Sequence, residues 1–197
     1  MSVSVRNRHD RVARGWIRIV AYLIAGALTV APNLARAQAA PVNEYQLKAV
    51  FLFNFAQFVD WPPAAFPDSQ TPLVICVLGE DQFGNSLDET VRGEKVNDRP
   101  LVVERYRRLD DLKTCHILFV SRSENDHLMQ IITALQGRNI LTVSDATGFA
   151  QHGGMVEFVT DKNKIRLDIN LDAAKAANLT ISSKLLRPAT IVASSTQ

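Results

Sequence analysis

Apolar residues cover nearly the whole circumference of the first predicted helix, residues 43–61. Asn43 is suited to cap its start, with Gln46 at the third helical position reaching back, and the Pro62-Pro63 pair forbids continuation. A helix that is apolar nearly all round is buried on most sides. We therefore expect its own domain to enclose it; the alternative is that part of its aromatic surface meets a partner or ligand. Its narrow polar stripe consists of Gln46, Asn54, Gln57 and Asp60.

Downstream of this helix, short apolar runs alternate with segments of helical spacing. The apolar runs predict four strands, at residues 73–78, 101–106, 115–121 and 140–143. Between them, helices are predicted at residues 81–91 and from Ser123 or Glu124 to residue 135, the second closed by Gly137. This β-then-α alternation predicts an α/β domain whose first half pairs its strands in parallel.

The second half of the chain has the alternating pattern of a hairpin. Residues 155–159 and 165–169 predict two antiparallel strands whose apolar positions face one side, while Glu157, Arg166 and Asp168 face water. Asp172 then caps a short helix, and Ser182 or Ser183 starts a last helical turn. We expect a single α/β domain with a mixed sheet flanked by helices over residues 42–190, followed by a flexible tail at 191–197.

The N-terminal segment has the organisation of a secretory signal peptide. Several arginines precede an apolar run at residues 19–31, and small residues follow around Ala35-Arg36-Ala37. We predict a signal peptide over residues 1–37, cleaved after Ala37 or Ala39, and a periplasmic mature chain that does not span the membrane. The alternative is an uncleaved anchor, although the run is shorter than the roughly 20 apolar residues that a membrane helix needs.

Removing this leader reverses the net charge. The whole chain has 22 Lys+Arg and 20 Asp+Glu, and residues 1–37 contain six Arg and one Asp, which leaves 16 against 19 and a net charge of −3. The remaining sequence has no basic run and no basic stripe with interleaved aromatic residues. Because nucleic-acid binding depends on such a charge pattern, that class of function is not expected.

The two cysteines of the chain, Cys76 and Cys115, both lie in predicted strands. In an oxidising compartment, two cysteines predict one disulfide. The alternative is that both are free thiols that pack as small hydrophobic residues. No CxxC pattern is present, so a redox-active or zinc-binding pair is not predicted.

The polar residues do not form a recognisable catalytic pattern. His116, His127 and His152 lack the spacing of metal ligands. Ser144-Asp145 follows a predicted strand without a GxSxG elbow, so we interpret it as a polar loop that caps the strand end, and a hydrolase is only a third alternative. We therefore predict a protein that is not an enzyme and has no metal or other cofactor.

Candidate binding residues occur in three places. Asn54 and Trp61 lie on the aromatic helix and are candidates for lining a small-molecule cleft or contacting a partner. For Asn54, the alternative is that its amide satisfies the backbone of a loop. His152 is followed by the one glycine cluster, Gly153-Gly154, which would expose backbone amides to an anion; a tight turn or bulge is the alternative. Arg166 on the hairpin is a candidate contact, with a solvated charge as the alternative.

Five segments of the chain, taken in order, resemble the YfiR family of periplasmic regulators. They are NEYQLKAVFLFNFAQFVDWP, VICVLGEDQFG, CHILFVS, ILTVSDATGFAQHGGMVEFV and NKIRLDINLDAAKAANLTISSKLLR. The resemblance runs from about Asn43 to Arg187, nearly the whole mature chain. Its first and last segments are the specific ones, because the middle strands alone would match many α/β proteins.

The resemblance implies a function, partners and a disulfide. It implies a non-enzymatic repressor that binds the periplasmic sensor domain of a YfiN-type inner-membrane diguanylate cyclase, lowering cyclic di-GMP and thereby regulating biofilm formation. A peptidoglycan-binding outer-membrane lipoprotein can sequester such a repressor. Members of the family form homodimers and carry a disulfide between strands, which Cys76 and Cys115 match. Some members carry a second cysteine pair, which is absent here around residues 143–155, so redox control through a second bridge is not carried over.

A binding protein of another class remains an alternative. In that interpretation the first helix and the glycine-containing strand enclose a small ligand, and the protein relays its presence to a different membrane receptor, such as a histidine kinase.

Overall fold

The computed structural model describes residues 43–161 and 164–195. The predicted signal peptide, its cleavage sites and the alternative membrane anchor lie outside these residues. Within the described ranges, no helix combines the length and the apolar character that crossing a membrane requires.

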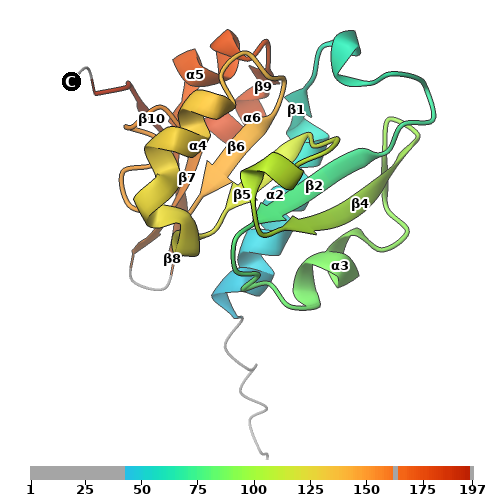
Figure 1. The fold of residues 1–197 in the computed structure, drawn as a ribbon, viewed down its shortest axis with the longest axis horizontal. Coiled ribbons are helices and arrows are strands. Elements are labelled where there is room, and N and C mark those ends of the chain that lie inside the picture. Colours follow the sequence, from blue (N-terminus) through green and yellow to red (C-terminus); the bar gives the residue numbers. More distant parts are fainter. Residues whose placement is uncertain (1–42, 162–163, 196–197) are drawn as a thin grey trace, which may run out of the picture. The chain divides into compact units, whose positions relative to one another are not determined.

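Eight strands of the described chain form one mixed sheet, in the order β10-β8-β7-β6-β5-β2-β4-β3 (Figure 1). Neighbouring strands are parallel except for the antiparallel pairs β7–β8 and β3–β4. The predicted class, a mixed α/β sheet with a parallel first half and an antiparallel hairpin, is therefore confirmed. The strands are β2 (Leu73–Leu78), β3 (Lys95–Val96), β4 (Arg99–Tyr106), β5 (Ile117–Val120), β6 (Leu141–Ser144), β7 (Val156–Asp161), β8 (Lys164–Asn170) and β10 (Thr190–Val192).

Alternate residues of the central strands enter two separate cores, one on each face of the sheet. On β2, for example, Ile75 and Val77 pack in the larger core, whereas Cys76 and Leu78 pack in the smaller one. The larger core is covered by α2 (Glu44–Phe58), α3 (Ser86–Val91), α5 (Leu171–Ala176) and α6 (Ser183–Leu186), and the smaller by α4 (Leu128–Ala134). This three-layer arrangement explains why the central strands are apolar at every position rather than alternating.

The first helix begins as predicted. The Asn43 side chain accepts from the backbone N–H of Tyr45, and Gln46 accepts from the Asn43 N–H, so the capping box is present. The helix ends at Phe58 rather than at residue 61, because Val59 and Asp60 extend into β1 (Val59–Asp60) and pair antiparallel with β9 (Thr180–Ile181). The following Trp-Pro-Pro sequence favours this extended backbone.

Two further helices are shorter than predicted. The helix expected at residues 81–91 starts at Ser86, because the Asp81 carboxylate accepts from the Phe83 N–H and forms a turn, and Gly84 follows with a φ of 54°. The helix expected from Ser123 begins as the 3-10 helix η3 (Arg122–His127), capped by the Ser121 hydroxyl, and becomes α4 at Leu128.

The hairpin forms as predicted, with one side chain reversed. Glu157 was expected to face water, but it is only 6 % exposed, and its carboxylate accepts from the backbone N–H groups of Gly148 and Ala150. The sheet is covered on both faces here, so the outward position of β7 is also a buried one. A carboxylate occupies this buried position because it accepts from the Gly148 and Ala150 N–H groups of the loop after β6, which need an acceptor.

The C-terminal part differs from prediction at two points. Asn170, rather than Asp172, caps α5 by accepting from the Ala173 N–H. The predicted boundary at residue 190 is crossed by β10, in which Ile191 and Val192 pair in parallel with β8. The backbone pairing on β8 thus continues into the first residues of the expected tail.

Candidate functional site

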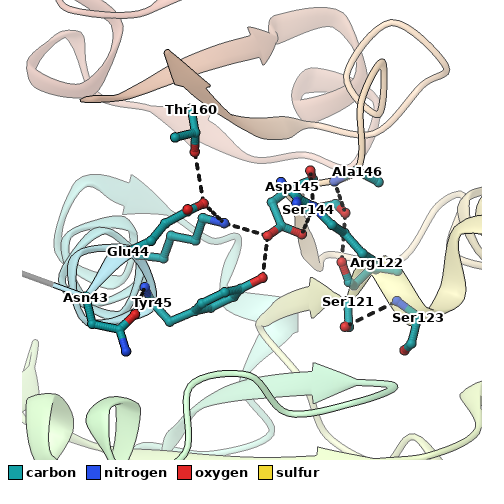
Figure 2. A network of polar contacts seen from close by, with 12 residues as sticks. Asn43, Glu44, Tyr45, Ser121, Arg122, Ser123, Ser144, Asp145, Ala146 and Thr160 are labelled. Carbon is teal, nitrogen blue, oxygen red and sulfur yellow. Dashed lines mark hydrogen bonds and ion pairs between the residues drawn. The ribbon is translucent and has the colours of Figure 1, made fainter. Parts of the chain in front are cut away.

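A polar network joins the first turns of α2 to the carboxyl ends of two central strands (Figure 2). We call this set the α2–β6 network; it comprises Glu44, Tyr45, Lys48, Arg122, Asp145 and Thr160. Asp145 directly follows β6, and Arg122 follows β5 by two residues, so the parallel pairing of these strands places both at one edge of the sheet. Asp145 is 97 positions from Lys48 in the chain, yet Lys48, Arg122 and Asp145 lie in one site.

Lys48 and Asp145 form the centre of this network. Both side chains are 0 % exposed, and Nζ of Lys48 lies 2.5 Å from Oδ2 of Asp145. The ammonium also contacts Oε1 of Glu44 at 2.6 Å and lies 4.3 Å from the centre of the Tyr45 ring. The Tyr45 hydroxyl donates to the same Asp145 oxygen at 2.8 Å. The buried charges are therefore paired and hydrogen-bonded, as buried ions must be.

Arg122 connects this buried pair to the surface. Its Nε donates to the Asp145 backbone carbonyl at 3.0 Å and lies 3.4 Å from Oδ1 of the Asp145 carboxylate. That Oδ1 atom has no hydrogen-bond partner among the described residues. The Arg122 side chain is 54 % exposed. The guanidinium is thus held at its Nε while the rest of it reaches solvent.

The ionisation of the network follows from these contacts. The hydrogen bond from Lys48 lowers the pKa of Glu44, and burial raises the pKa of Tyr45, reinforced by its hydrogen bond to Asp145. At neutral pH Glu44 is therefore ionised and Tyr45 keeps its proton as a donor. With two cations and two carboxylates the network is balanced in charge.

The serine beside Asp145 is fully engaged in backbone contacts. The Ser144 hydroxyl donates to the Val120 carbonyl at 2.7 Å and accepts from the Ala146 N–H at 3.0 Å. The interpretation of Ser144-Asp145 as a strand-end cap is thus correct for Ser144 but incomplete for Asp145, which forms the ion pair. Among the described residues, no three His, Cys, Asp or Glu side chains gather as metal ligands would.

The predicted disulfide is present. Cys76 on β2 and Cys115, two residues before β5, are bonded across 6.1 Å between their Cα atoms. Both lie in the smaller core beneath α4. The bridge therefore lies on the face of the sheet opposite to α2.

Trp61 belongs to a separate aromatic cluster near the amino end of β5, whereas the network lies at the carboxyl ends of β5 and β6. Its indole N–H donates to the His116 carbonyl at 3.2 Å, and Phe66 stacks on the His116 ring with a centroid distance of 4.4 Å. The Arg99 guanidinium lies 4.1 Å from the centre of the Phe66 ring. The predicted candidate Trp61 thus contacts His116, the residue before β5, rather than the glycine cluster.

The glycine cluster lies elsewhere, in the loop between β6 and β7. His152 and Gly153 line a cleft of about 590 Å³ together with residues of α4 and α5. Gly154 has a packing reason, because a Cβ there would lie 2.2 Å from Cε1 of Phe149. His152 is exposed, and its Nδ1 lies 2.6 Å from the Gly148 carbonyl.

The remaining candidates occupy two other parts of the surface. Asn54 lies half-buried on α2, and Arg166 is exposed on β8, where it faces Asp161 at 3.6 Å. The predicted candidates Asn54, Trp61, His152, Gly153, Gly154 and Arg166 are therefore not gathered into one site.

The α2–β6 network was not predicted from the sequence. One signal was available: Lys48 is the one cation in a mostly apolar helix, and a charge that the helix must bury needs a partner. The partner was not evident, because Asp145 is distant in the chain and follows a strand like many surface aspartates.

The chain matches a known family over most of its length. A family model described as YfiR/HmsC-like matches residues 45–190. This range begins within α2 and ends at the start of β10, so it includes every residue of the network except Glu44. None of the curated proteins matches the chain.

Proposed function

Because the chain belongs to the YfiR/HmsC-like family, we propose that it is a periplasmic repressor that binds the sensor domain of an inner-membrane diguanylate cyclase. The family match over residues 45–190 carries this proposal, since resemblance to the YfiR family implies a periplasmic regulator of such a cyclase. Binding would hold the cyclase inactive and keep cyclic di-GMP low. No bond-making step by the repressor itself is required.

Arg122 is the network residue that we propose contacts the cyclase. Its contacts within the described residues use Nε, and its side chain is 54 % exposed. A guanidinium held in this way loses little conformational freedom on binding, and arginine is enriched among the residues that dominate protein interfaces. Its terminal nitrogens fit an acidic side chain of the partner, with which they form a two-pronged hydrogen-bonded pair.

The primary test measures cyclic di-GMP in cells. Deleting the gene is expected to raise cyclic di-GMP and surface attachment, and the wild-type gene is expected to restore both. Arg122→Ala should restore them poorly, while Arg138→Ala, which changes an exposed arginine outside the network, should restore them fully. Unchanged cyclic di-GMP after deletion, under every envelope stress tested, would contradict the repressor function.

A binding measurement separates the surface from the function. The purified mature chain is expected to bind the purified periplasmic domain of the cyclase, and Arg122→Ala to weaken binding by about tenfold or more, equivalent to about 1.4 kcal/mol. The melting temperature of each variant must stay close to that of the wild type. Wild-type binding that Arg122→Ala leaves unchanged would place the interface on another surface and leave the repressor function intact.

Export is a further part of the proposal. A cleaved signal peptide predicts a periplasmic protein that begins at Gln38 or Ala40, and the intact mass of the protein from a periplasmic extract decides between the two. A full-length chain in the membrane fraction would instead indicate an uncleaved anchor.

We also propose two further partners, which the resemblance implies. A second copy of the chain would form a homodimer, which light scattering of the purified protein measures. A peptidoglycan-binding outer-membrane lipoprotein would compete with the cyclase for the repressor, and adding its soluble domain to the complex is then expected to release the cyclase domain.

A small-molecule sensor is the second candidate function, and one observation favours it. The cleft beside His152 and Gly153, about 590 Å³, is within the usual size range of ligand pockets, roughly 300–1,000 Å³. Its walls come from α4, α5 and the C-terminal residues rather than from α2. A thermal-shift screen with nucleotides and aromatic metabolites tests it, and a ligand whose effect is lost in His152→Ala would support this function over the first.

A further inference from the structure

His116, the residue before β5, is buried with both ring nitrogens facing backbone groups. It is 1 % exposed. The Val74 N–H donates to Nδ1 at 3.1 Å, so Nδ1 must carry a lone pair. Nε2 lies 3.1 Å from the Ala65 carbonyl, which can only accept, so Nε2 must carry the proton. The neutral imidazole with its proton on Nε2 is thus the form that satisfies both neighbours.

The cover over this ring comes from the segment that follows β1. Phe66 stacks on the imidazole, Trp61 lies edge-on to it with a centroid distance of 6.4 Å, and Ala65 supplies the acceptor for Nε2. The rest of the surroundings, β2 and β5, belong to the central sheet. His116 therefore links residues 61–66 to the sheet.

A second proton on His116 is incompatible with these contacts. Nδ1–H would point at the Val74 N–H, placing two donors face to face without an acceptor. The positive charge would be buried, and burial lowers the pKa of His116. The hydrogen bond to the Ala65 carbonyl opposes this effect, and the nearby Arg99 cation adds to it. Arg99 also lies 4.1 Å from the centre of the Phe66 ring, so that ring already contacts one cation.

Two carboxylates lie near this cluster, and the described part of the chain shows no hydrogen bond or ion pair from either to the imidazole. Asp60 lies with Trp61, Phe66 and Arg99 around a small hollow of about 80 Å³. The Asp68 carboxylate accepts from the backbone N–H groups of Gln70 and Thr71. Neither carboxylate is therefore positioned to form an ion pair with a protonated His116 that stays buried.

Of the segments around His116, residues 61–66 are expected to move on protonation, because they are held by less regular structure than the strands. Residues 73–78 and 117–120 are fully buried strands of the sheet. Residues 61–66 contain only the short 3-10 helix η1 (Pro63–Ala65), which has no side-chain cap. The imidazolium reaches water most easily when this segment moves away, because few backbone hydrogen bonds hold it.

We propose that His116 is an acid-responsive switch, which on protonation releases the Trp61–Phe66 segment from the sheet and changes the surface of the protein near Trp61. This goes beyond the repressor function, because it adds control by the pH outside the cytosol. It does not depend on which partner the protein binds.

Trp61 itself reports the release. The chain has two tryptophans, and the other, Trp16, lies in the predicted leader, so the mature protein contains Trp61 alone. As the pH falls from about 7.5 to about 4.5, we expect Trp61 emission to shift to longer wavelength and acrylamide to quench it more strongly. The transition should involve one proton, so the ratio of released to closed protein changes by up to about tenfold per pH unit. Far-UV circular dichroism should stay native throughout.

Matched variants assign the transition. His116→Asn places an amide oxygen near the Nδ1 position, where it accepts from the Val74 N–H, and cannot titrate in this range, so its emission should not change with pH. His127→Gln and His152→Gln, which change the two histidines that are exposed among the described residues, should keep the wild-type transition. Persistence of the transition in His116→Asn, or loss of the circular dichroism signal in the same step, would overturn the proposal.

A measurement on the wild type covers the case in which His116→Asn does not fold. Long-range ¹⁵N correlation spectra of the imidazole report its protonation directly. The spectra should show protonation only at Nε2 at pH 7.5, and protonation of both nitrogens with the same midpoint as the change in Trp61 emission. A His116 ring that stays neutral while the emission changes would equally overturn the proposal.

Discussion

Lys48 and Asp145 form an ion pair in which both side chains are 0 % exposed, although 97 positions separate them in the chain. Removing two charges from water costs several kcal/mol for each ion, so such a pair persists only with further hydrogen bonds. Glu44 and Tyr45 supply them here. The pair attaches the first turns of α2 to the end of β6 and thereby positions Arg122, which we propose as the contact with the cyclase.

Replacing Lys48 with methionine is expected to be strongly destabilising. Lys48→Met removes the buried cation that contacts Asp145 and leaves the carboxylate only the longer contact with Arg122 at 3.4 Å, which costs about 3–5 kcal/mol of the free energy of unfolding. Urea denaturation followed by Trp61 fluorescence measures this loss. Lys175→Met is the control, because that lysine is 72 % exposed and should change the stability by less than about 0.5 kcal/mol.

The double variant Lys48→Met/Asp145→Leu distinguishes the cost of an unpaired charge from the value of the pair. Since it removes both charges, it should be more stable than the two single effects added together predict. Additive effects would show that the two side chains are not energetically coupled.

Loss of either cysteine is expected to have the same effect as loss of both. The bridge closes a loop with a sequence separation of 39, for which loop entropy predicts about 4 kcal/mol. Cys76→Ser, Cys115→Ser and the double variant should therefore lower the stability of the oxidised protein by similar amounts. Two thiols titrating in the native, unreduced wild type would contradict the bridge.

Charges at two phenylalanines of α2 should differ in effect. Phe55 is 0 % exposed and stacks on Phe158, so Phe55→Asp is expected to prevent folding, since even Phe→Ala costs about 3–5 kcal/mol in a core. Phe58 is only half-buried, and the Lys184 ammonium lies 5.0 Å from its ring, so Phe58→Asp should destabilise less. Circular dichroism melting curves give the comparison, and a native curve for Phe55→Asp would contradict the described core.

Gly154→Ala should destabilise through a clash rather than through backbone strain. An added Cβ would lie 2.2 Å from the Phe149 ring, and such overpacking costs about 1–3 kcal/mol. Phe149→Leu in the Gly154→Ala background should recover part of this loss, because it removes the atoms that clash. No recovery in the double variant would show that Gly154 is needed for another reason. Chemical denaturation of Gly154→Ala and of the double variant measures both effects.

Alkaline pH should weaken the α2–β6 network through Tyr45. Burial raises the pKa of Tyr45, so the folded state disfavours its ionisation. The corresponding stability is fully present below the unfolded pKa of about 10 and is lost as the pH rises above it. The free energy of unfolding is therefore expected to fall above pH 10, and to fall less in Tyr45→Phe. An identical pH dependence in both proteins would exclude Tyr45 as the cause.

The start of α2 and the class of the fold were predictable because their causes are local. Asn43, Gln46 and the prolines at 62 and 63 act on neighbouring residues, and runs of apolar residues report burial on both faces of a sheet. The two cysteines predicted their bridge because no other cysteine was present as a partner. The helix starts at residues 86 and 128 were harder to place, since a turn formed by Asp81 and a 3-10 segment compete with weak helical patterns.

Two buried polar residues outside the candidate site depended on contacts that the sequence pattern does not show. Glu157 has the alternation of an exposed residue, but the loop packed against it presents unpaired amides, and only the folded chain brings them together. The same holds for His116, whose neutral form is required by Val74 and Ala65.

The sequence by itself thus determined the helix cap, the class of the fold and six of its strands, at residues 73–78, 101–106, 115–121, 140–143, 155–159 and 165–169. It also carries the resemblance to a family. The tertiary structure alone decided that Lys48 meets Asp145 and that Trp61 and Phe66 cover His116. The physical reason is that local propensities act over a few residues, whereas the pairing of buried charges and the state of a buried imidazole depend on which strands become neighbours in the sheet.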